Sequence, residues 1–109
     1  FLTQFGIGAN FEQRNHFRDD ELEIYDDPQL DPPINFRPGM MSFAGKGPNT
    51  RSAEVFIVMP GASRETLDFF GKDNTWETPF GYVDPDDLQV VGSWQSYGDM
   101  PPVRKKFRN

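Results

Sequence analysis

Bulky apolar residues gather in short runs along the chain, and Gly, Pro and acidic residues separate these runs. Residues 1–7 predict a strand that Gly6 and Gly8 weaken near its end. Residues 40–44 and 54–59 predict two further strands, because both are rich in Phe, Val, Ile and Met. The second of these is almost continuously apolar, which indicates that both of its faces are covered.

The pattern becomes less regular after these strands. Residues 60–78 predict irregular backbone with a few large side chains as anchors, and residues 79–83 predict another short strand. The predicted anchors are Leu67, Phe69, Phe70 and Trp76.

The clearest helix is predicted over residues 85–95. Asp84 suits its N-cap and Pro85 its first helical position, and Gly98 suits a residue just beyond its end. Its predicted buried stripe consists of Leu88, Val91 and Trp94. Several strands with one clear helix favour a single, mainly β domain.

Charge divides the chain into an acidic body and a basic end. The formal net charge is −6, which excludes a uniformly basic nucleic-acid surface, so no nucleic-acid partner is expected. Residues 12–31 predict a long acidic loop. Residues 1–103 are expected to form the domain, and residues 104–109 a basic tail. The longest apolar run, residues 55–59, is far too short to span a membrane.

Common catalytic and metal-binding patterns do not fit this chain. It has no Cys, and this absence is compatible with any cellular compartment. Its one His is His16, and no serine in a strained turn lies near it, as a catalytic triad would require. The carboxylates of residues 84–87 suit helix capping better than calcium binding. Residues 45–50 lack the Gly-Lys-Ser/Thr ending of a phosphate-binding loop. We therefore expect neither a metal nor a cofactor.

One stretch is far more specific than the rest. Residues 39–57 read Gly-Met-Met-Ser-Phe-Ala-Gly-Lys-Gly-Pro-Asn-Thr-Arg-Ser-Ala-Glu-Val-Phe-Ile, and they closely resemble the signature of cyclophilin-type peptidyl-prolyl isomerases. Residues 1–6 resemble the family strand Phe-Met-x-Gln-Gly-Gly, and residues 80–83 resemble its Phe-Gly-x-Val strand. The resemblance implies a mainly β fold, a closed antiparallel β-barrel with a capping helix. It also implies that the N-terminal and C-terminal parts of that domain lie outside this chain.

The resemblance further implies a substrate site. The matching residues are Phe1, Leu2, Gln4, Ala44, Gly45, Glu54, Phe56, Leu67 and Glu77. An apolar floor for a proline ring would come from Phe1, Leu2 and Phe56. Gln4 and the backbone around Ala44 and Gly45 would bind the peptide chain by hydrogen bonds. Plain core packing remains an open alternative for the strand residues. The family's catalytic arginine falls before the position of Phe1, so no catalytic residue is assigned here.

Two departures from the family pattern lower the expected activity. Glu54 replaces a glutamine and, when ionised, accepts hydrogen bonds without donating any. Glu77 stands at the position of the pocket histidine and makes the rim more anionic. The sequence therefore predicts a proline-peptide-binding or structural module with weak or no isomerase activity.

The expected partners are a proline-containing peptide or protein segment and other subunits of a large complex, docked through the acidic loop and basic tail. The alternatives are an active isomerase that assists protein folding and a small-ligand carrier that uses the barrel lumen.

Overall fold

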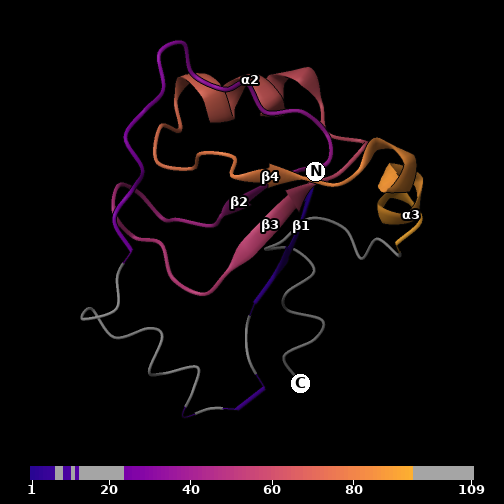
Figure 1. Cartoon of the computed structure of the whole chain (residues 1–109), viewed down its shortest axis with the longest axis horizontal. Helices are drawn as coiled ribbons and strands as arrows, with labels where there is room; N and C mark the ends of the chain where they lie inside the picture. Colours follow the sequence, from indigo (N-terminus) through magenta and orange to yellow (C-terminus); the bar gives the residue numbers. More distant parts are fainter. Residues whose placement is uncertain (7–8, 11, 13–23, 95–109) are drawn as a thin grey trace.

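The computed structural model describes residues 1–6, 9–10, 12 and 24–94, and its centre is a four-stranded antiparallel sheet (Figure 1). The strands are β1 (Leu2–Phe5), β2 (Met40–Phe43), β3 (Val55–Val58) and β4 (Gly81–Tyr82), in the order β1-β3-β2-β4. Each lies within a range that predicted a strand. The short runs of Phe, Val, Ile and Met therefore predicted the strands of the sheet.

The sheet is open, so the expected closed β-barrel is wrong. Among the described residues, β1 pairs with β3 and β4 pairs with β2, and the edge strands β1 and β4 do not pair with each other. Closure requires such pairing between tilted edge strands, and four short strands are too few for it. An open sheet also encloses no lumen, so the described residues offer no site for the small-ligand carrier.

A helix that the residue pattern did not predict covers one side of the sheet. The irregular backbone expected over residues 60–78 is wrong for α2 (Arg64–Lys72). Ser63 is its N-cap, and the Ser63 hydroxyl accepts a hydrogen bond from the backbone N–H of Thr66. Glu65 places a negative charge in the first turn, where the helix dipole favours it.

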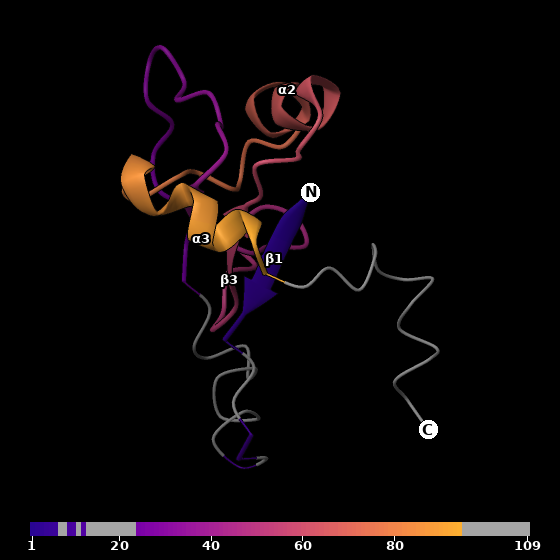
Figure 2. The same cartoon turned by 90° about the vertical axis from the view of Figure 1, so that its right-hand side faces the viewer.

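The core lies between α2 and the side of the sheet that carries Phe56 and Val58 (Figures 1 and 2). Its buried members are Phe36, Phe56, Val58 and Phe70. Leu67 packs against this cluster, three residues before Phe70 along α2, so both side chains share one helix face. The apolar face of α2 thus covers the core.

The predicted helix over residues 85–95 begins as expected but is shorter. It consists of the 3-10 turn η2 (Pro85–Asp87) and α3 (Leu88–Gly92). Asp84 accepts a hydrogen bond from the backbone N–H of Asp86 at 2.9 Å, which confirms the capping prediction. The predicted buried stripe is wrong in part, because Trp94 follows the end of α3 and is 45% exposed.

Several predicted features fall outside the described residues. They are most of the acidic loop, including His16, then Gly98, and the basic tail over residues 104–109.

Candidate functional site

The register of β1 and β3 places Gln4 directly opposite Phe56. Directly opposed residues of antiparallel strands project from the same face, so the Gln4 side chain shares the face of Phe56. Leu2 lies opposite Val58 on that face and packs against the core cluster. Gln4 itself is exposed. The side chains of Leu2 and Gln4 on β1 and of Phe56 on β3 therefore lie on one face of the sheet.

An aromatic cluster covers this face. The ring centroid of Phe70 lies 5.5 Å from that of Phe56 and 4.8 Å from that of Phe36. Phe1 joins the edge of the cluster, 6.5 Å from Phe70. Phe56 is only 1% exposed and packs as a core residue. A ligand that reaches Phe56 therefore has to displace Phe36 or Phe70, whereas the rim of the cluster is accessible directly.

The turn after β2 forms the polar part of the site. The backbone N–H of Gly45 donates to Oε1 of Glu77 at 2.9 Å, and Asn74 Nδ2 donates to Oε2 of the same carboxylate. The backbone N–H of Ala44 donates to the carbonyl of Glu54 at 2.9 Å. Glu54, through its backbone carbonyl, and Glu77, through its carboxylate, therefore both bind the segment that follows β2.

Burial raises the pKa of Glu77 above its ordinary value of 4.5. The hydrogen bonds from Gly45 and Asn74 act in the opposite direction, because they stabilise the charged form. Asn74 is itself buried, and its Oδ1 accepts from the backbone N–H of Glu77 at 3.1 Å. The carboxylate of Glu77 is thus held in a fixed orientation at the turn.

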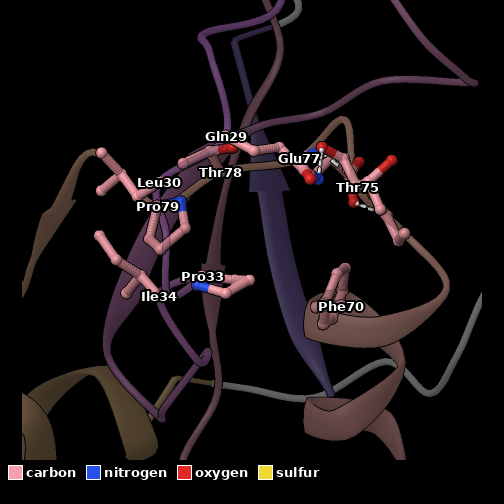
Figure 3. Close-up of a pocket in the computed structure, with 10 residues that line it drawn as sticks. Gln29, Leu30, Pro33, Ile34, Phe70, Thr75, Glu77, Thr78 and Pro79 are labelled. Atoms are coloured by element: carbon pink, nitrogen blue, oxygen red, sulfur yellow. Dashed lines mark hydrogen bonds between the residues drawn. The ribbon is translucent and has the colours of Figure 1, made fainter.

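A shallow pocket opens next to Glu77 (Figure 3). Its volume of about 30 Å³ holds one or two water molecules, and a proline ring does not fit without rearrangement. Phe70 lines this pocket and also packs against Phe56, which is not among the lining residues. The rest of the lining comes from the loop before β2, including Gln29 and Ile34, and from the segment between α2 and β4, including Thr78 and Pro79.

A buried arginine fastens this loop to the Gly-Pro-Asn turn. Arg51 pairs with Asp27 at 2.9 Å and lies 3.6 Å from Asp26. Asp26 also exchanges two hydrogen bonds with Asn49, one through each backbone N–H. Asn49 adopts a left-handed conformation with φ of 55°, which asparagine tolerates well. The Gly-Pro-Asn turn (residues 47–49) and Arg51 therefore fix the position of the loop that forms one wall of the pocket.

The structure brings the predicted site residues together and adds residues that the sequence analysis missed. All of the predicted residues lie around the aromatic cluster or the turn after β2. Phe36 and Asn74 were not predicted. No periodic pattern surrounds Phe36, whereas an Asn three residues before Glu77 is a recognisable local hydrogen-bonding signal.

Comparisons with protein-family models, with curated proteins and with solved structures give no match for this chain. The cyclophilin resemblance therefore rests on the motif residues themselves. In the part of the chain that the structure describes, no helix is long and apolar enough to cross a membrane.

Proposed function

We propose that this chain is a cyclophilin-like module that binds a proline-containing segment of a peptide or protein, with weak or no isomerase activity. The observation that carries the proposal is the convergence of the motif residues. Residues as distant in sequence as Gln4, Phe56 and Glu77 lie around one aromatic cluster and the turn next to it. A peptide would meet apolar rings, the amide of Gln4 and the backbone of this turn.

The chemistry of the site supports binding more than catalysis. Rotation about a peptide bond crosses a barrier of roughly 18–20 kcal/mol. Catalysis requires groups that stabilise the twisted amide better than the planar one. A donor to the amide nitrogen is one such group, and an ionised Glu54 cannot act as that donor. The same apolar and polar contacts would still bind the ground state.

Tryptophan fluorescence offers a direct binding test. Trp76 lies beside Gly45, and the chain has 2 tryptophans. In a Trp94→Phe background, Trp76 becomes the sole reporter of the site. A short peptide with an Ala-Pro bond should change its fluorescence with a saturable curve, and the matched Ala-Ala peptide should bind less tightly.

A matched pair of glutamine variants locates the binding. Gln4→Ala removes an exposed amide from the proposed site and should weaken binding by about two- to tenfold, the range of one hydrogen bond. Gln89→Ala removes an exposed amide from α3 and should leave binding unchanged. Equal affinity for the Pro and Ala peptides would refute the proposed function.

The alternative, an active isomerase, makes a different prediction. It requires faster cis–trans exchange of the bound X–Pro peptide, a reaction that takes tens to hundreds of seconds without a catalyst. Exchange NMR on the same peptide separates the two functions, because binding without faster exchange supports the module and excludes the isomerase.

A further inference from the structure

Glu77 is a half-buried carboxylate with no cationic partner among the described residues. The ion pairs there join Arg51 to Asp26 and Asp27. Glu77 accepts instead from two neutral donors, the backbone of Gly45 and the amide of Asn74. A carboxylate offers about four acceptor positions, so about two remain available on Glu77. Burial already disfavours this charge, and a cation beside it would offset that cost.

The pocket next to Glu77 has walls that suit an alkyl chain. Figure 3 shows Leu30, Pro33, Ile34 and Pro79 grouped on one side of the pocket. These side chains are apolar, and Leu30 and Ile34 are partly exposed to solvent. A lysine side chain buries its methylene groups on such a surface while its charged end reaches a polar partner.

The size of the pocket selects among cations. A volume of about 30 Å³ has room for one or two groups of the size of a water molecule. A primary ammonium is a compact charge of that size, whereas the planar guanidinium of arginine is larger. An ammonium has three N–H donors, and the pocket lining includes the polar residues Gln29, Thr75 and Thr78 besides Glu77.

We propose that this pocket receives the ammonium group of a lysine side chain of the bound peptide, which pairs with Glu77. The inference rests on the proposed function for the source of the lysine and adds a side-chain preference to it. The site thereby distinguishes lysine from arginine and from neutral side chains.

The test is a set of peptides that carry one proline and a lysine at successive positions around it. At one position, lysine should bind about tenfold more tightly than acetyl-lysine, which corresponds to about 1.4 kcal/mol. A peptide with arginine at that position should lack most of this gain in affinity. Glu77→Gln should abolish the preference for lysine, and Glu65→Gln, which removes an exposed carboxylate of α2, should preserve it. Equal binding of the lysine and acetyl-lysine peptides at every position would overturn the inference, and that comparison needs no variant.

A second measurement does not depend on proline. The backbone amide of Gly45 donates to Glu77, so its NMR resonance reports occupation of the pocket. n-Butylammonium should shift this resonance with a saturable curve, and n-butanol should not. The absence of a shift would overturn the lysine site even where proline peptides bind. A shift together with equal affinity for Pro and Ala peptides would instead refute the proposed function and leave the ammonium site supported.

Discussion

Phe70 belongs to both the core and the pocket lining, so replacing it tests the packing of both. It is 5% exposed, packs against Phe36 and Phe56, and lines the pocket beside Glu77. Its neighbour Phe69 is 47% exposed on the same helix. Phe70→Ala and Phe69→Ala therefore delete the same ring from adjacent positions with very different surroundings.

The expected magnitudes follow from burial. Truncating a buried phenylalanine to alanine costs about 3–5 kcal/mol, because the ring's transfer energy is lost and a cavity remains. Phe69→Ala should cost about 1 kcal/mol or less, since much of its ring already contacts water. A loss of 3 kcal/mol is a large part of the roughly 5–15 kcal/mol that stabilises a typical domain. Phe70→Leu keeps part of the volume and should retain a measurable folded state.

Urea unfolding followed by circular dichroism measures these differences. Thermal melts give a second measure. For a domain of about this size, each kcal/mol of lost stability lowers the melting temperature by roughly 4–8 °C, so Phe70→Ala should melt at least about 12 °C below the wild type. Equal losses for Phe70→Ala and Phe69→Ala would refute the packing of α2 on the sheet, because that packing is what makes the two positions different.

Three further predictions concern a helix cap, a glycine with positive φ and the half-buried carboxylate of Glu77. Ser63→Ala removes the N-cap of α2 and should lower the free energy of unfolding by about 1 kcal/mol in urea titrations; no change would contradict the cap. Gly6→Ala should cost more than about 1 kcal/mol, since its φ is +107° and a Cβ there would lie 2.2 Å from the carbonyl oxygen of Ala53. Gly61→Ala is its control, with no atom near the added Cβ, and similar losses for both would refute the steric argument. The raised pKa of Glu77 means that the folded state binds this proton more tightly than the unfolded state. Relative to Glu77→Gln, the wild type should therefore gain stability as pH falls from 7 toward 4.5 in thermal melts, and a pH-independent difference would contradict this sign.

The individual strands could be predicted because their information is local. Runs of Val, Ile and Phe predicted β3 and its neighbours within a residue or two. Closure into a barrel was inferred from the resemblance, and it depends on which edge strands pair. That pairing is a long-range property that no local pattern of residues specifies.

The helix α2 could have been recognised. Ser63 followed by Glu65 is a helix-start signal, and Leu67 and Phe70 recur at helical spacing. The adjacent Phe69 broadened the apolar run and concealed this period. Phe36 could not have been found in this way, because a single aromatic residue in a loop shows its role only through the distant side chains it meets.

Among the residues that the resemblance places in the site, Gln4 is the only one whose side chain carries a neutral N–H donor. The side chain of Glu54 accepts from Ser52, and that of Glu77 accepts from Gly45 and Asn74. Arg51 is buried against Asp26 and Asp27, so its guanidinium is not exposed at the surface. Any isomerase activity would therefore need its donor from Gln4 or from residues other than these. Since binding needs only acceptors, backbone amides and apolar rings, these residues suit the proposed peptide binding better than catalysis of isomerisation.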